Sequence, residues 1–268
     1  MKHLGKHNLL GVFVSALDYE AAVDNIIRAA QQGRGFSVTA LAVHGVMTGV
    51  LDRAQRYRLN HMDLVTPDGQ PVRWGLNLLH QTKLPERVYG PRLMLEVLTA
   101  AVVSELPVYF YGSRLEVLER LAERLQKCFP ALVIAGMEPS KFRVTTPEEK
   151  EAIGLRIKSS GAKMTFVGLG CPRQEVFAYE YRDLLGMPII AVGAAFDFYA
   201  GVLKEAPTWA QRWGLQWCVR LAQEPRRLWW RYLLLNPAYL FLLTCQALRL
   251  WKPKPDQAKA PSYDLRYG

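Results

Sequence analysis

The stretch Lys163–Gly201 reads KMTFVGLGCPRQEVFAYEYRDLLGMPIIAVGAAFDFYAG and contains two apolar segments that each end at a glycine-rich corner. The first segment stops at Gly168 before a proline and a Gln-Glu pair, and the second stops at Gly193. An apolar run that ends at glycine and is followed by such helix-start residues predicts a strand leading directly into a helix. Two corners in succession predict neighbouring parallel strands whose loops share one sheet edge, where open α/β sheets bind ligands.

The corners favour an anionic ligand such as a diphosphate, because backbone N–H groups and helix N-termini would point toward one place. A lone Gly-x-Gly is more often a tight turn, but polar residues follow both corners here. Gln174 and Glu175 are either capping residues or ligand contacts, with Gln174 donating to a ligand oxygen and Glu175 accepting from a ribose hydroxyl. Asp197 lies among aromatic residues and needs donors from a nucleotide base or a backbone amide. The candidate donor-binding residues at these corners are Gly168, Gly170, Pro172, Gln174, Glu175, Gly193 and Asp197.

The rest of the chain alternates predicted strands with helices, which is typical of parallel β-α-β units in a doubly wound, Rossmann-like α/β sheet. The expected strands cover residues 9–14, 36–42, 62–65, 107–111, 132–135, 164–167 and 189–192. The expected helices cover residues 18–32, 44–60, 72–80, 90–104, 113–128 and 147–160. We expect a Rossmann-like domain over residues 1–205, a helical appendage over 206–251 and a flexible tail over 252–268.

Asp68 is the candidate general base. It lies in the turn sequence Thr-Pro-Asp-Gly after a short predicted strand, where an aspartate is more often simply a good turn residue. The functional interpretation places its carboxylate at the ligand-binding edge of the sheet. No two aspartates are separated by one residue, so the Asp-x-Asp element that commonly holds a divalent cation on a nucleotide-sugar is absent from the sequence. We therefore expect no metal and no cofactor, with helix termini and arginines stabilising a diphosphate leaving group.

The 268 residues carry a formal charge of +10, which calls for an anionic partner. Much of this charge lies between Arg212 and Lys254, where arginines alternate with tryptophans and leucines. This composition fits a membrane interface better than a nucleic-acid groove. The apolar run of residues 228–251 is interrupted by Arg231 and Pro237, so we expect no membrane span. The N-terminal residues are expected to form a strand and not a signal peptide, and the four scattered cysteines indicate a reducing compartment.

These motifs together resemble the WecG/TagA/CpsF family of bacterial glycosyltransferases. The resemblance rests on ordered motifs across about residues 9–235: TPDG (66–69), YGS (111–113), GLGCPRQE (168–175), GAAFDFYAG (193–201), AP (206–207), GLQW (214–217), RL (220–221), EPRR (224–227) and RYL (231–233).

The resemblance implies a metal-independent, inverting enzyme that transfers a sugar from a UDP-sugar to a polyprenyl-diphosphate-linked saccharide in cell-surface polysaccharide biosynthesis. It implies a cytoplasmic enzyme bound peripherally to the inner face of the membrane. Whether the enzyme forms a homo-oligomer is left open. It places Asp68 as the base, Gln174 at the donor, and the arginines of the appendage at the lipid diphosphate. By the same resemblance, donor contacts include Gly112 and Ser113, and the acceptor contacts are Arg220, Arg227 and Arg231.

The sequence departs from the family at the end of its second predicted strand. The family commonly has Thr-x-Asn there, with the Asn in the sugar site, whereas this chain has Ala40 and Ala42. The identity of the transferred sugar is therefore open, and His44 is either a substitute donor contact or an ordinary helix-start residue. A non-catalytic membrane adaptor is an alternative. A dinucleotide-dependent oxidoreductase is a weaker one, because neither corner has Gly-x-Gly-x-x-Gly with an acid about twenty residues later.

Overall fold

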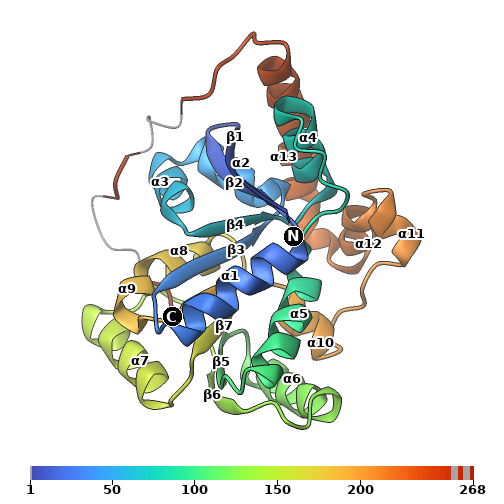
Figure 1. Cartoon of the computed structure of the whole chain (residues 1–268). Coiled ribbons are helices and arrows are strands. Elements are labelled where there is room, and N and C mark those ends of the chain that lie inside the picture. Colours follow the sequence, from blue (N-terminus) through green and yellow to red (C-terminus); the bar gives the residue numbers. More distant parts are fainter. Residues whose placement is uncertain (1, 255–258, 262–265) are drawn as a thin grey trace.

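A six-stranded, fully parallel sheet with helices on both faces forms the centre of the protein (Figure 1). The computed structural model describes residues 2–254, 259–261 and 266–268, apart from the side chains of residues 212 and 227. The strand order is β4-β3-β8-β7-β5-β6. The strands are β3 (Phe36–Leu41), β4 (Leu64–Pro67), β5 (Val108–Gly112), β6 (Ile134–Glu138), β7 (Met164–Gly168) and β8 (Pro188–Ala191). The predicted doubly wound, Rossmann-like fold is confirmed, including the pairing of β7 with β8.

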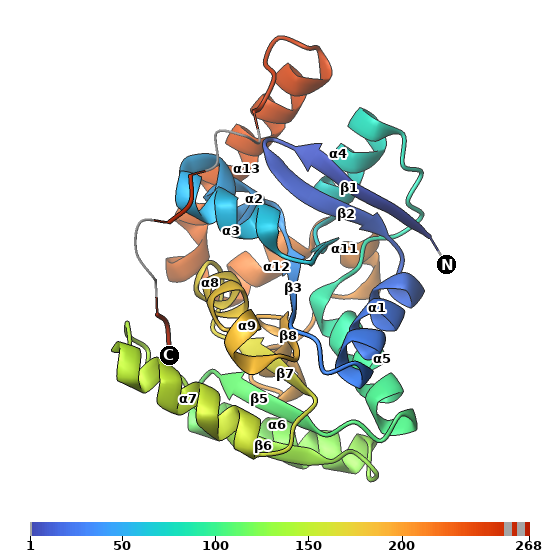
Figure 2. The same cartoon turned by 60° about the vertical axis from the view of Figure 1, so that its left-hand side comes forward.

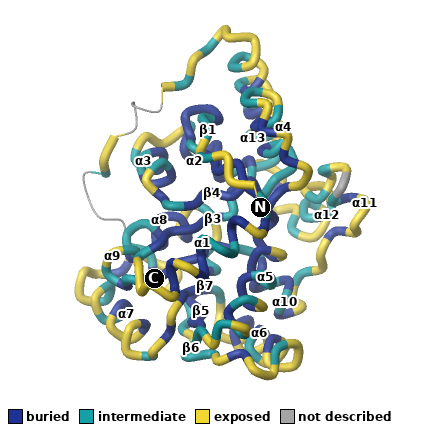
Figure 3. Tube along the Cα trace, in the orientation of Figure 1, coloured by how far each residue is buried: buried dark blue, intermediate teal, exposed yellow. Residues whose placement is uncertain are grey.

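Alternate residues of the central strands face two separate apolar cores, one on each side of the sheet. In β5, Val108 and Phe110 join one core, while Tyr109 and Tyr111 join the other. The first core is covered by α1 (Tyr19–Gln31), α5 (Gly90–Val103), α6 (Leu115–Cys128) and α10 (Ala195–Tyr199). The second is covered by α2 (Val43–Leu51), α3 (Arg53–His61), α7 (Pro147–Ser159), α8 (Arg173–Glu180) and α9 (Arg182–Leu185). Burial on both faces explains why these strands read as continuous apolar runs (Figure 3).

Several predicted elements differ from the observed ones for local reasons. The expected first strand is an antiparallel hairpin of β1 (His3–Leu9) and β2 (Val12–Leu17), because Leu10 and Gly11 both adopt positive φ in a tight turn. The expected helix over 44–60 is two helices, because Asp52 is extended and its carboxylate accepts from the backbone at the start of α3. The helix expected from residue 113 begins at Leu115, with Arg114 as its N-cap.

The C-terminal region forms three helices beside the sheet, α11 (Thr208–Arg212), α12 (Gln216–Gln223) and α13 (Pro225–Ala247) (Figures 1 and 2). The second half of α13 is part of the fold's interior, because Tyr239 and Leu243 are buried in the second core. The Tyr239 hydroxyl donates to the Pro71 carbonyl at 2.9 Å, beside α4 (Gln70–His80). Among the described residues, no helix has the length and apolar character needed to cross a bilayer.

Parts of the predicted flexible tail make defined contacts. The Pro253 carbonyl accepts from the Asn8 side chain, and Lys259 donates its backbone N–H to Arg53. Residues 266–268 lie against the loop that precedes α7, where Tyr267 forms an antiparallel bridge with Val144. The tail residues 255–258 and 262–265 lie outside the described part of the chain. In its described parts the tail passes from the end of α13 back toward the sheet domain (Figure 2).

Candidate functional site

A cavity of about 820 Å³ lies at the carboxyl edge of the sheet and is closed on one side by α12 and α13. Its walls come from the ends of β3, β4, β5, β7 and β8, from the loop after β6, and from the C-terminal helices. Nearly all predicted site residues line this cavity: His44, Asp68, Ser113, Gly168, Gly170, Pro172, Gln174, Glu175, Gly193, Asp197, Arg220 and Arg231. The side chain of Arg227 lies outside the described part of the structure.

Gly112 is not part of the cavity wall, but it allows the strands beneath the cavity to approach one another. Its φ is +107°, and an added Cβ would lie 3.0 Å from the backbone of Gly168 on the neighbouring strand. Gly193 has a similar role at the second corner, since an added Cβ would lie 3.1 Å from the Gln174 side-chain oxygen. The end of β5 and the second corner therefore require glycine so that the walls can come close.

Asp68 is held at the end of β4 by contacts with its main chain and its carboxylate. Its backbone N–H donates to Leu41 at 3.2 Å, and its Oδ1 accepts from the Gly90 N–H at 3.2 Å. The Arg87 guanidinium donates to the Asp68 carbonyl oxygen at 3.1 Å. Because the Gly90 bond occupies Oδ1, we expect Oδ2 to be the carboxylate oxygen that takes a proton from a ligand.

The pKa of Asp68 is raised from its usual value, because burial penalises the charged carboxylate more than the surroundings stabilise it. The charge of Arg87, the Gly90 N–H and the charge of Arg220 oppose this shift, in that order. A carboxylate with a raised pKa is a stronger base than a solvent-exposed one. Asp68 therefore has the electrostatic character of a general base.

Glu175 is directed into the protein. It is 1% exposed, and its Oε1 accepts from the Thr39 hydroxyl and from the Gln174 amide, both at 3.0 Å. Burial raises its pKa, which favours the neutral acid. The expected ribose contact of Glu175 stays a prediction, because the contacts described here are with protein groups.

Gln174 is 4% exposed and lies between Glu175 and Gly193 at the second corner. Its amide nitrogen is used by Glu175, while its Oε1 is buried without a hydrogen-bond partner among the described residues. Because an orphaned buried acceptor is costly, this oxygen is available to a ligand N–H or O–H. One Gln174 N–H donates to Glu175 and the amide carries a second, so the predicted donation to a ligand oxygen stays a prediction beside an acceptor role for Oε1.

The start of α2 contains the residues that depart from the family pattern. Ala42 is the N-cap and provides no side-chain bond to the helix, and an added Cβ on Gly69 would lie 3.7 Å from the Ala42 Cβ. His44 follows on the same cavity wall, and burial together with the nearby Arg231 charge lowers the pKa of His44 to about 4. His44 is therefore neutral near pH 7 and can either donate or accept one hydrogen bond.

The two described arginines of the predicted acceptor set come from different helices. α12 ends at Gln223 and α13 begins at Pro225, so Arg220 and Arg231 do not share one helix face. Both side chains nevertheless line the cavity, and Arg220 pairs with Glu224 at 3.2 Å. The break at Glu224 folds the two helices back on each other and so brings both arginines to the cavity.

Arg87, Tyr89 and Gln216 also line the site and were not predicted from the sequence. Arg87 is 9% exposed and its guanidinium lies over the Tyr89 ring, 4.4 Å from the centroid. The Gln216 amide donates to the Tyr89 hydroxyl at 2.7 Å, which connects α12 to the sheet domain. The segment Pro85–Tyr89 has no periodic pattern, so only the tertiary structure reveals these residues.

Within the described part of the chain, no three His, Cys, Asp or Glu side chains gather closely enough to hold a metal ion. Five arginines line the cavity, namely Arg87, Arg114, Arg173, Arg220 and Arg231, together with the acidic residues Asp68, Glu175, Asp197 and Glu224. A negatively charged ligand would therefore meet guanidinium groups and helix N-termini.

Comparison with known proteins gives consistent results. Residues 7–253 match the glycosyl transferase WecG/TagA/CpsF family. The chain is 32% identical over 183 residues, 68% of each chain, to an N-acetylglucosaminyldiphosphoundecaprenol N-acetyl-beta-D-mannosaminyltransferase of Bacillus spizizenii. It is 27% identical over 202 residues to a protein of the same name from Bacillus subtilis, covering 74% of this chain and 76% of that protein. Because the family match covers most of the chain and includes every wall of the cavity, the protein belongs to the WecG/TagA/CpsF family of glycosyltransferases.

Proposed function

We propose that this glycosyltransferase moves a sugar from a UDP-sugar to a saccharide linked to a polyprenyl diphosphate, at the surface of a membrane. The main observation is that one cavity joins a base, two glycine-rich corners and arginines of the C-terminal helices. The names of the two Bacillus relatives support a lipid-diphosphate acceptor. Two parts of the proposal, the UDP group of the donor and a reaction without a metal ion, are supported by the chemistry of the site alone.

The proposed reaction is a single in-line displacement. Asp68 accepts the proton of the acceptor hydroxyl while that oxygen attacks the anomeric carbon of the donor. The new C–O bond forms as the bond to the UDP oxygen breaks, and the electron pair leaves on the diphosphate. Attack from the opposite face inverts the anomeric configuration.

The leaving diphosphate would lie at the corners after β7 and β8. The N-terminus of α8 and the guanidinium of Arg173 would stabilise its growing negative charge there. Arg220 and Arg231, on the other side of the cavity, would bind the acceptor diphosphate through charge-assisted hydrogen bonds. Both substrates thus approach Asp68 through positively charged surroundings.

Exposed aromatic and apolar residues near the cavity support membrane docking. Trp213 is 75% exposed and Trp230 is 62% exposed, and both belong to the C-terminal region that closes the cavity. Trp74 and Leu78 of α4 are also exposed, and the Trp74 ring lies against Gly214. Tryptophans beside arginines suit the lipid headgroup region, where one end of the side chain is apolar and the other polar.

Release of UDP tests the proposal. The full-length protein is incubated with a panel of UDP-sugars, including UDP-N-acetylmannosamine, and a prenyl-diphosphate-linked N-acetylglucosamine. We expect UDP release with at least one donor, and only when the acceptor is present. UDP binding without any release would favour the alternative, a membrane adaptor that keeps the fold, which the alanines at positions 40 and 42 keep open.

A further inference from the structure

Phe142 lies at the rim of the cavity in a conformation that large side chains rarely adopt. Its side chain lines the cavity and the residue is 56% exposed, although phenylalanine is usually buried. Its φ is +54°, in the left-handed region that costs a bulky residue free energy. Such strain persists only where the surroundings enforce it, and it concentrates at functional sites.

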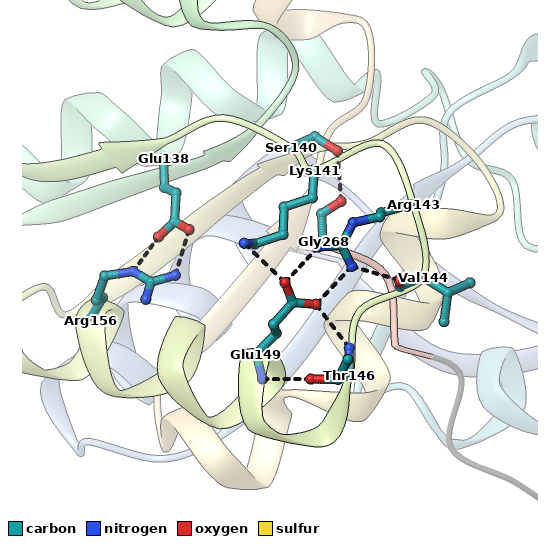
Figure 4. A network of polar contacts seen from close by, with 9 residues as sticks. All are labelled: Glu138, Ser140, Lys141, Arg143, Val144, Thr146, Glu149, Arg156 and Gly268. Carbon is teal, nitrogen blue, oxygen red and sulfur yellow. Dashed lines mark hydrogen bonds and ion pairs between the residues drawn. The ribbon is translucent and has the colours of Figure 1, made fainter.

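The loop that carries Phe142 is held by a network around Glu149 of α7 (Figure 4). The Glu149 carboxylate accepts from the Thr146 backbone at 3.0 Å and from Arg143 at 2.8 and 2.5 Å. Lys141 adds an ion pair at 3.4 Å. The residues on both sides of Phe142 are therefore fixed to the start of one helix.

Hydrogen bonds of Phe142 and of the nearby Ser140 also hold this loop. The Phe142 backbone N–H donates to the Ser140 hydroxyl at 2.9 Å, and that hydroxyl donates to the Gly268 carbonyl at 2.8 Å. The Ser140 N–H donates at 3.0 Å to Ser113, another cavity residue with positive φ. The loops after β5 and β6 thus form one hydrogen-bonded unit that holds the aromatic ring at the cavity.

The position of this unit defines what it can bind. Phe142 follows β6 and Asp68 follows β4, so the two residues approach the cavity from opposite edges of the sheet. If the reacting sugar lies at Asp68 and the diphosphate at the corners after β7 and β8, the rest of the nucleotide continues toward β5 and β6. An exposed aromatic ring there offers a stacking surface for a planar base.

We propose that Phe142 is the stacking platform for the base of the nucleotide donor, and that the braced loop holds the ring in place. This inference rests on the proposed UDP-sugar donor and adds the subsite that binds its base. Base–aromatic stacking depends on the planar ring and not on the phosphates. The effect of changing Phe142 must therefore vanish for a ligand that has no base.

Isothermal titration calorimetry on the full chain tests this with UDP and with inorganic pyrophosphate as ligands. The variants are Phe142→Ala, Phe142→Asn, which tolerates positive φ without an aromatic ring, and Phe142→Trp, which keeps a stacking surface. Val144→Ala is the matched control, because Val144 is exposed in the same loop but does not line the cavity. Thermal unfolding confirms that each variant is folded.

We expect Phe142→Ala and Phe142→Asn to weaken UDP binding by roughly tenfold to a hundredfold, the usual range for losing one base–aromatic stack. Pyrophosphate binding should not change, and Phe142→Trp and Val144→Ala should bind UDP nearly as the wild type does. Equal UDP affinity of the wild type and both ring-deleted variants would overturn the base subsite alone. Failure of the wild type to bind UDP would contradict the proposed donor, and the inference with it.

Discussion

As the proposed general base, Asp68 must meet two requirements that oppose each other. A general base must be ionised to accept a proton, yet burial makes the charged form of Asp68 unfavourable. Arg87 and the Gly90 N–H partly offset this penalty and keep the carboxylate in position. The cavity thus holds a reactive carboxylate at the expense of some stability, as is common at active sites.

Asp68→Asn should abolish most of the transfer activity and stabilise the fold at neutral pH. Loss of a general base typically lowers a rate by roughly a hundredfold to ten-thousandfold. Because the folded pKa is raised, ionised Asp68 destabilises the protein above that pKa. This cost declines as the pH falls through the folded pKa and is gone below the unfolded one. The Asp68→Asn variant should therefore have a higher melting temperature than the wild type at pH 7, and this difference should shrink in acid. Near-normal turnover by the variant would show that Asp68 is only a turn residue.

Glu175 should tolerate Gln but not Ala. Its Oε1 accepts from Thr39 and Gln174, and a Gln oxygen can accept both bonds. Glu175→Ala leaves two buried donors unpaired, which should lower the free energy of unfolding by about 1–3 kcal/mol. It should also raise the KM for the donor, because Gln174 loses its fixed orientation. Denaturant unfolding and initial-rate kinetics of both variants check this; equal damage by Gln and Ala would show that the charge of Glu175 is required.

Site residues could be predicted from the sequence where local motifs carry them. Asp68 lies between Pro67 and Gly69 directly after β4, and Gln174 and Gly193 belong to the glycine-rich corners after β7 and β8, so their place at the sheet edge follows from chain direction. Arg87 and Phe142 have no such signal, because long-range packing brings them to the cavity. The hydrogen bond from the Gln174 amide to Glu175 could not be predicted either. It depends on the position of the Glu175 carboxylate, which also accepts from Thr39 on another strand.

Among the elements, those with strong local signals were predicted best. Asp18 caps α1 as expected, and α7 begins at Pro147 with Thr146 as its N-cap. The first hairpin was missed because the apolar run 9–14 continues through its turn, and the break at Asp52 was missed because only the extended backbone of that residue separates α2 from α3. The docking of α13 on the sheet domain through Tyr239 could not be inferred either, because its partners are distant in sequence.

Contact between α13 and α2 should be detectable through His44. Burial and the Arg231 charge lower the pKa of His44 to about 4. Arg231→Gln should therefore raise this pKa, measured by NMR titration of the imidazole nitrogens, while burial keeps it below the usual value. Arg226→Gln is the control, because Arg226 is exposed and lies outside the cavity wall. An unchanged pKa in the Arg231 variant would show that this arginine does not reach the start of α2 in solution.

At the level of the whole molecule, exposed tryptophans belong to the C-terminal region that closes the cavity. Trp213→Ser combined with Trp230→Ser should weaken binding to vesicles that contain anionic lipid. Each large apolar side chain contributes up to about 1.5–3 kcal/mol when it leaves water, so the loss should be roughly tenfold or more. UDP binding should be unaffected. Leu155→Ser on α7 is the control, since it is equally exposed but lies far from the C-terminal helices (Figure 1); an equal loss with this variant would contradict the docking surface.

Metal removal addresses the whole catalytic arrangement. Because arginines and helix N-termini surround the proposed diphosphate site, transfer should continue in EDTA and gain little from Mg²⁺ or Mn²⁺. Initial rates before and after chelation provide the measurement. An enzyme that is silenced by EDTA and restored by Mn²⁺ would contradict this account of the leaving group.

We propose that a hydroxyl activated by Asp68 displaces UDP in one step inside this cavity. The anomeric configuration of the product tests it most directly. The lipid-linked saccharide made from the preferred UDP-sugar is isolated, and its new glycosidic linkage is assigned from the one-bond carbon–proton coupling by NMR. A single displacement gives a linkage of opposite configuration to that in the donor. Retention of the donor configuration would require a second displacement and would contradict it.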